Sequence, residues 1–253
     1  MSEGRVTVQV TDHIGRVVFH HPQSNSLPSS LLAALAEAVT EAGNNKDVRV
    51  IILESEGEKA FCAGASFDEL TAISTLEEGK AFFSGFARVI NAMRKCPKLI
   101  IGRIHNKAVG GGVGLASATD YCFATENASV KLSELAVGIG PFVVGPAVER
   151  KVGLSGMSQM AIDAASWHTA EWARQHGLYQ RVFASIAEMD EAIMTLATTL
   201  SKSSPEAMEA LKRVCWQGTD HWETLLYERA EISGRLVLSD FTRNAIAAFK
   251  ASR

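Results

Sequence analysis

The chain lacks the features that mark several large classes of protein. Its formal net charge is −3 over 253 residues. That balance offers no case for a nucleic-acid partner, since such proteins usually carry a basic patch. No stretch approaches the roughly 18 consecutive apolar residues of a transmembrane helix, and Met1–Arg5 contains no apolar signal core. We therefore expect neither nucleic acid nor membrane as a partner.

Cysteines are few and far apart. The four positions, none of them in a C-x-x-C pair, are Cys62, Cys96, Cys122 and Cys215. We interpret them as reduced thiols of a cytoplasmic protein, and we expect them to be buried filler rather than nucleophiles. No group of His, Cys, Asp and Glu has metal-ligand spacing, so we expect no metal site.

Common catalytic signatures are also missing. There is no G-x-x-x-x-G-K-[ST], which excludes a P-loop, and no G-x-S-x-G, which argues against an α/β-hydrolase triad. Linkers, low-complexity segments and repeats are absent. With 47% apolar and 21% charged residues, the composition is typical of a soluble globular protein with one large domain, or one domain and a small appendage.

Strand-like and helix-like segments alternate in the first half of the chain. A hairpin is predicted at 6–10 and 16–20, further strands at 48–53, 99–104, 121–125 and 129–131, and helices at 31–39, 67–72 and 77–93. Beyond Pro146 we expect one more strand at 179–183, and helices at 154–163, 169–175, 186–200, 205–216 and 222–238. This pattern predicts an α/β fold with a parallel-rich core and a helical C-terminal part.

The glycine-rich run 110–114 follows a predicted strand and opens a predicted helix. Glycine lets backbone approach a ligand closely, and the first N–H groups of a helix lack intrahelical partners. A phosphate site, an oxyanion hole and close helix packing are the alternatives, and the lack of G-x-G-x-x-G spacing weakens the first. A second loop of small residues, Phe61–Ser66, favours the oxyanion hole, because two such loops can aim one N–H each at a shared point.

Glu134 is the candidate acid–base residue. It lies in the largely apolar, glycine-containing segment Lys131–Gly140. Desolvation raises the pKa of a carboxyl group in such surroundings, so that it can exchange protons near neutral pH. The alternative is an exposed or ion-paired loop glutamate, and the sequence leaves both open.

Several of these segments resemble the crotonase family, also called the enoyl-CoA hydratase/isomerase superfamily, and the resemblance extends over nearly the whole chain. Phe61–Ala65 and Lys107–Gly112 are similar to its two CoA-binding and oxyanion loops, Ser133–Pro141 to its catalytic-glutamate segment, and Ala247–Lys250 to its C-terminal end. This resemblance implies an α/β fold with a crotonase-like ββα-spiral core, and a C-terminal helical oligomerisation region that builds a homotrimer or a dimer of trimers. We place the core at 1–195 and the helical region at 196–253.

The resemblance also implies a substrate and a set of roles. The substrate is an acyl-CoA thioester, with coenzyme A entering as part of the substrate and no separate cofactor. Its thioester oxygen is expected to bind the N–H groups of Ala65 and Gly111, with Glu134 as general acid and base. The residues expected to contact the CoA part are Ala63, Gly64, Ala65, Gly110 and Gly111.

The chain departs from the family's hydratase pattern at Gly114, where that pattern has a glutamate. Hydration by the two-glutamate scheme needs a carboxylate to orient water, whereas one carboxylate suffices to move a proton between carbons. We therefore expect isomerisation of 3-enoyl-CoA to 2-enoyl-CoA in fatty acid metabolism, favoured further by the apolar Phe142. Hydration of a 2-enoyl-CoA such as methylglutaconyl-CoA, acyl-CoA decarboxylation and an inactive acyl-CoA-binding paralogue stay open. So does replacement of the missing carboxylate by Asp68 or Glu69.

Overall fold

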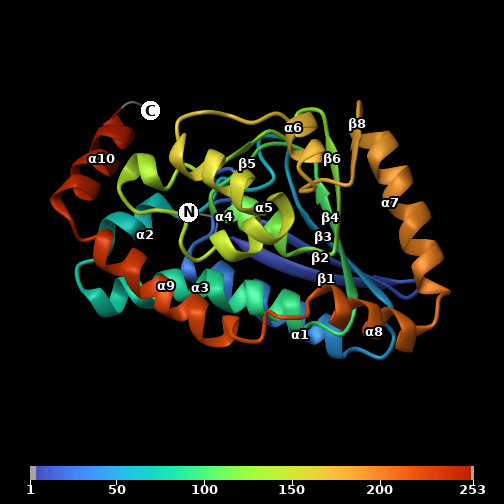
Figure 1. The fold of residues 1–253 in the computed structure, drawn as a ribbon. Helices are drawn as coiled ribbons and strands as arrows, with labels where there is room; N and C mark the ends of the chain where they lie inside the picture. The colour runs from blue at the N-terminus through green and yellow to red at the C-terminus, as the bar shows by residue number, and fades with distance from the viewer. Residues whose placement is uncertain (1–3, 252–253) are drawn as a thin grey trace.

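A largely parallel sheet forms the centre of the computed structural model, which describes residues 4–251 (Figure 1). Within that range the order across the sheet is β1 (Arg5–Thr11), β2 (Ile14–His20), β3 (Val50–Ser55), β4 (Leu99–Ile104), β6 (Tyr121–Thr125) and β8 (Arg181–Phe183). Only β1 and β2 pair antiparallel in this sheet. The predicted hairpin and the parallel-rich α/β core are confirmed. Residues 1–3, part of the stretch predicted to lack a signal core, lie outside the described residues.

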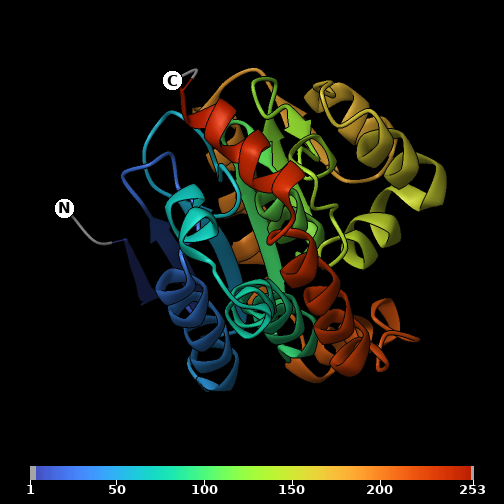
Figure 2. The ribbon, with the colours of Figure 1, turned by 90° about the vertical axis from the view of Figure 1, so that its left-hand side faces the viewer.

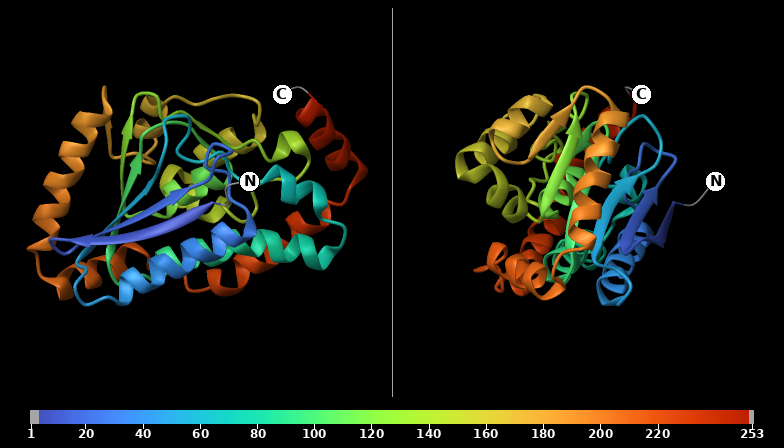
Figure 3. Two further views of the ribbon diagram at one scale, coloured as in Figure 1. Left: turned by 180° about the vertical axis from the view of Figure 1, so that it is seen from behind. Right: turned by 90° about the vertical axis from the view of Figure 1, so that its right-hand side faces the viewer.

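Helices cover both faces of the sheet (Figure 3). On one face α7 (Ile186–Ser201) packs Met189 and Ile193 into a cluster with apolar side chains of β2, β3, β4 and β6. On the other face lie α1 (Ser29–Asn44) and α3 (Leu76–Lys95), whose apolar stripes enter the larger core. Every residue of β3 is buried because it lies between two such layers, as expected for a central parallel strand.

The remaining helices of the described residues lie around both ends of the sheet. They are α2 (Phe67–Ala72), α4 (Gly111–Ala118), the 3₁₀ turn η1 (Leu135–Val137), α5 (Gly145–Ile162), α6 (Ala170–Gln175), α8 (Pro205–Cys215), α9 (Trp222–Leu236) and α10 (Asp240–Ala251). α8 lies at the end opposite α2 and α10 (Figure 1). α5 contains two helical segments separated by a kink at Gly153 (φ 70°), and the predicted helix at 154–163 corresponds to the second; the first segment was not predicted. The sequence also did not predict α10 or the two-residue strand β5 (Ala108–Val109).

A second row of short parallel pairings runs beside the main sheet. It contains β5 paired with β7 (Val130–Lys131), a bridge from Cys62 to Ala108 and a bridge from Leu27 to Ala65. Each pairing follows a strand of the main sheet, so the chain winds as a spiral of long strand, short strand and helix. The row brings together the loops that follow β3, β4 and β6.

Two of the C-terminal helices return to the first half of the chain. α9 lies along α3, and their backbones touch where Gly234 meets Gly79. α10 contacts α2 and η1 (Figure 2), with Phe241 and Thr242 packed against Gly138. The division at 195/196 and the oligomerisation role of the later helices stay predictions.

Three of the cysteines match their prediction and one does not. Cys62, Cys96 and Cys122 are buried, whereas Cys215 is exposed at the end of α8. The expectation of buried filler is therefore wrong for Cys215, whose position on the helix faces outward. In the described part of the chain, no helix is long and apolar enough to span a bilayer. No potential metal-binding group of three or more His, Cys, Asp or Glu is found there either.

We predict that Gly234→Ala lowers the free energy of unfolding. A Cβ at Gly234 would lie 2.6 Å from the backbone N of Lys80, so α3 and α9 must separate, and overpacking of this kind costs about 1–3 kcal/mol. Urea unfolding followed by circular dichroism measures the change. Gly145→Ala is the control, because its Cβ would meet only the ends of two flexible side chains, Met157 Cε at 3.1 Å and Arg229 Nη1 at 3.6 Å. Equal stability of Gly234→Ala and wild type would contradict the close crossing.

Candidate active site

The two loops predicted to supply backbone donors lie side by side. Val109 N donates to Cys62 O at 2.9 Å and Phe61 N donates to Lys107 O at 3.0 Å, which fixes the loop after β3 against the loop after β4. Gly110 N then donates to Lys131 O at 2.8 Å, which fixes the next loop in turn. The short pairings thus hold three loops at one point.

Glycine is required at Gly64 and Gly110 by both conformation and space. Gly64 has φ 85°, and a Cβ there would lie 2.9 Å from Val109 O. Gly110 has φ 51° and ψ −114°, a combination that residues with a Cβ avoid. The same Gly64 Cβ would be 3.6 Å from Gly111 N, so the two loops approach without side chains between them.

The amides of Ala65 and Gly111 are not used inside the fold. Gly111 is the first residue of α4, so its N–H has no intrahelical acceptor. Among the described residues, no backbone carbonyl accepts a hydrogen bond from Ala65 N or Gly111 N. Both residues border the same cavity. Two main-chain donors are therefore available to a ligand oxygen, with the positive end of α4 behind one of them.

Glu134 follows β7 and faces the glycine loop across the cavity. A Cβ on Gly110 would lie 2.8 Å from Glu134 Oε1, so the carboxylate lies directly against that backbone. Its Oε2 is enclosed and has no hydrogen-bond partner in the described chain. The residue as a whole is partly exposed, but Oε2 is enclosed and no described cation pairs with it, so it is not the exposed or ion-paired loop glutamate of the alternative.

Burial sets the proton affinity of Glu134. Desolvation raises its pKa to about 7, and the hydrogen bond from its own backbone N–H opposes this only weakly. No cationic side chain of the described residues forms an ion pair with it. A carboxylate with such a pKa is present in both protonation states at neutral pH, which suits a group that takes and returns a proton.

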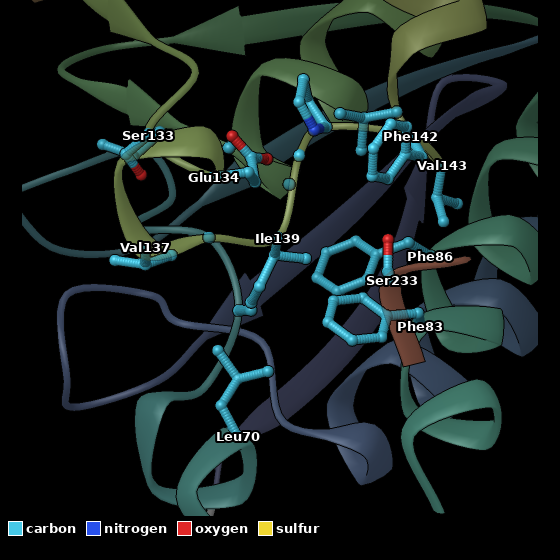
Figure 4. A pocket seen from close by; sticks show the side chains of 18 of the residues that line it. Leu70, Phe83, Phe86, Ser133, Glu134, Val137, Ile139, Phe142, Val143 and Ser233 are labelled. Carbon is cyan, nitrogen blue, oxygen red and sulfur yellow. The ribbon is translucent and has the colours of Figure 1, made fainter. Parts of the chain in front are cut away.

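The cavity between these groups is narrow and mostly apolar (Figure 4). Aromatic side chains from α3, Phe83 and Phe86, form one wall, with Ile139 and Phe142 opposite. The Phe86 ring packs directly against the backbone of Gly111, since a Cβ on Gly111 would be 2.1 Å from Phe86 Cε1. Of the described lining residues, only Glu134 is titratable. Ala63, Gly64 and Gly110 lie along the same lining.

The space beside Gly114 is filled by Val144. A Cβ on Gly114 would lie 2.5 Å from Val144 Cγ1 and 2.7 Å from its Cβ. A carboxylate is missing from this position, and an apolar side chain fills the space that it would need. The sequence shows that the carboxylate is missing. It does not show that Val144 fills the space, because Gly114 and Val144 lie 30 positions apart.

Asp68 and Glu69 do not replace the missing carboxylate. Glu69 Oε2 accepts hydrogen bonds from the N–H and hydroxyl of Ser29 at the start of α1, both at 2.8 Å. Asp68 Oδ2 accepts from Gln23 Nε2 at 2.8 Å. Neither residue lines the cavity, so both act in the surrounding structure.

The sequence did not identify the apolar walls or Ser233. Phe83 and Phe86 lie within the helix predicted at 77–93, and no local pattern marks them as facing a cavity. Ser233 reaches the cavity from α9, about a hundred residues after Glu134. No local pattern distinguishes such a serine from one on any helix face.

Comparison of the sequence with known proteins identifies the family to which the chain is similar. A family model described as "Enoyl-CoA hydratase/isomerase" matches residues 9–250. The peroxisomal Delta(3,5)-Delta(2,4)-dienoyl-CoA isomerase of Arabidopsis thaliana is 29% identical over 240 residues, 88% of this chain and 84% of the relative. The human mitochondrial methylglutaconyl-CoA hydratase is 33% identical over 200 residues, 78% of this chain and 58% of the relative.

Among solved structures, an enoyl-CoA hydratase from Bacillus halodurans has a TM-score of 0.88 at 20% identity, covering 96% of this chain and 99% of that one. At this identity the match shows a shared fold. It confirms the ββα-spiral architecture expected from the sequence.

We predict that Glu134→Gln has a higher free energy of unfolding than wild type, and that this difference increases with pH. Between the ordinary pKa of 4.5 and the raised value of about 7, native Glu134 keeps a proton that the unfolded chain releases. The wild-type free energy of unfolding therefore falls as pH rises through this window, on the order of 3 kcal/mol in total. Glutamine does not titrate.

Denaturant midpoints at pH 4.5, 6 and 8 measure this difference, with Glu58→Gln at an exposed position as the control. A difference between Glu134→Gln and wild type that stays constant over this range would contradict a buried, raised-pKa carboxyl group.

Proposed function

Because the chain belongs to the enoyl-CoA hydratase/isomerase family, we propose that it is an acyl-CoA isomerase that converts 3-enoyl-CoA to 2-enoyl-CoA. One observation carries the choice of reaction: a single carboxylate, Glu134, lies beside two unused main-chain amides in a mostly apolar cavity. Such a site is equipped to form an enolate and move one proton. Among the described residues that line it, there is no second acid to direct a water molecule.

In the proposed reaction Glu134 removes the proton from C2 of a 3-enoyl thioester. The electron pair moves through the double bond system to the thioester oxygen, giving a dienolate. Glu134 then returns the proton to C4, and the double bond closes between C2 and C3. One proton leaves and one returns, so neither water nor an electron donor is consumed.

The amides of Ala65 and Gly111 are proposed to bind the thioester oxygen while its negative charge develops. Their positions are fixed by the hydrogen bonds between loops before substrate binds, so little reorganisation is needed. A donor of this kind typically contributes about 2.7–4 kcal/mol to transition-state stabilisation. Ala63, Gly64 and Gly110, on the same lining, are proposed to allow the CoA part to approach the backbone.

Hydration of a 2-enoyl-CoA is the second candidate. It is favoured by the names of relatives, which include a methylglutaconyl-CoA hydratase and a short-chain-enoyl-CoA hydratase. Two features argue against hydration: Gly114 supplies no carboxylate, and the apolar side chain of Val144 fills the space beside it. Phe142 adds to the apolar lining and leaves little to orient a water molecule.

We predict that Glu134→Gln lowers turnover of 3-enoyl-CoA about 10²–10⁴-fold, the usual contribution of a general acid–base group. In wild type, kcat/KM should rise with pH with an apparent pKa of about 7, because the ionised carboxylate is the base. Turnover is followed by the absorbance of the conjugated product. Wild-type-like turnover by Glu134→Gln would remove this residue from the mechanism.

The reaction itself is identified by incubating the wild type with 3-enoyl-CoA and, separately, with 2-enoyl-CoA in deuterated water. Isomerisation predicts deuterium at C2 or C4 and no hydroxyl product. A 3-hydroxyacyl-CoA formed at a comparable rate would establish the hydratase instead. An absence of any turnover, with acyl-CoA still bound, would indicate a binding protein.

We predict that Gly114→Glu alone does not create a hydratase. The new side chain must displace Val144, whose Cγ1 lies 2.5 Å from where its Cβ would be, so the variant should lose about 1–3 kcal/mol of stability. Combining it with Val144→Gly, which removes both Cγ1 and the Cβ that would lie 2.7 Å away, should recover part of that loss. Thermal unfolding and a 3-hydroxyacyl-CoA assay on both variants test this, with Val144→Gly alone as the control. Hydratase activity and wild-type stability in the single variant would contradict the steric argument.

A further inference from the structure

The cavity has a second polar feature that the proposed reaction does not use. Ser233 of α9 is 2% exposed and lines the cavity. Figure 4 shows its hydroxyl directed toward Phe142 and Phe86 and away from its own helix. Its hydroxyl forms no hydrogen bond with another described residue, and its Oγ is not among the fully enclosed atoms, so it is accessible from the cavity. A hydroxyl that faces a cavity without a protein partner is available as a donor or acceptor to a ligand there.

Ser233 lies at the opposite end of the cavity from the proposed reaction centre. Figure 4 shows Glu134 on one side of Ile139 and Phe86, and Ser233 on the other. A thioester held at Gly111 would extend its acyl chain past Phe86 toward this end. The whole cavity measures about 60 Å³, where one water needs about 10–15 Å³. The acyl group that fits is therefore short.

Two contacts of α9 fix the position of Ser233. Next to it, Gly234 makes the backbone contact with α3. One turn earlier in α9, Arg229 Nη1 donates to the carbonyl oxygen of Phe142 at 3.4 Å, which links this helix to the opposite wall. The close helix crossing needs a small residue beside Gly234, but alanine would satisfy it. The hydroxyl is the part that packing does not explain.

We propose that Ser233 is a specificity-determining residue, which donates a hydrogen bond to an oxygen at the far end of a short acyl chain. The preferred substrate is then an acyl-CoA whose chain carries a carbonyl or carboxylate oxygen several carbons from the thioester. This inference rests on the proposed acyl-CoA function and narrows its substrate class. It assigns no part in proton transfer to Ser233.

The test compares equilibrium binding of three saturated five-carbon thioesters, which the enzyme does not turn over: pentanoyl-CoA, 4-oxopentanoyl-CoA and glutaryl-CoA. We expect wild type to bind at least one of the oxygenated ligands about 3- to 10-fold more tightly than pentanoyl-CoA, the gain from one hydrogen bond. Which of the two gains more distinguishes a neutral carbonyl from a carboxylate. Isothermal titration calorimetry gives each Kd.

Ser233→Ala should abolish this preference and leave pentanoyl-CoA binding unchanged. Ser84→Ala is the matched control, because Ser84 is a buried serine of α3 that does not line the cavity. Circular dichroism confirms that each variant is folded. Equal binding of all three ligands by wild type, or a preference that survives in Ser233→Ala, would overturn this inference alone. Failure to bind any of the thioesters would overturn the proposed function with it.

Discussion

The short parallel row beside the main sheet is the constraint on which the site depends. Hydrogen bonds from Phe61, Val109 and Gly110 each tie one loop to the next. A main sheet alone would place the ends of β3, β4 and β6 near one another without fixing where their loops point. The second row fixes that direction, so the Ala65 amide, the Gly111 amide and the Glu134 carboxylate border the same small cavity.

Close approach and burial then act together on that cavity. Gly64 and Gly110 remove side chains from between the loops, and Phe86 fills the space beside Gly111. The same packing that excludes water raises the pKa of Glu134. Packing and acid–base chemistry are therefore not separable here, because a looser cavity would return the carboxyl group to its ordinary proton affinity.

Much of this could be predicted from the sequence, and the missing part has a common cause. The hairpin at β1 and β2 and the long helices α3 and α7 have strong local periodicity, and the loops at Ala65 and Gly111 have a distinctive composition. The strand β5 has two residues and exists only through its partners. The Val144 side chain against Gly114, and Ser233 in the cavity, depend on contacts between segments far apart in the chain. Local pattern carries no information about such contacts.

The two amides that face the cavity belong to the main chain, and this has a consequence for how such a protein diversifies. A side-chain donor is lost in a single codon change, whereas a peptide N–H survives nearly every substitution at its own residue. Selection can therefore alter the apolar walls, the neighbourhood of Gly114 and the contribution of α9 one residue at a time, while the paired amides persist. The part of the site that persists is therefore the backbone geometry, and the parts that vary are the side chains.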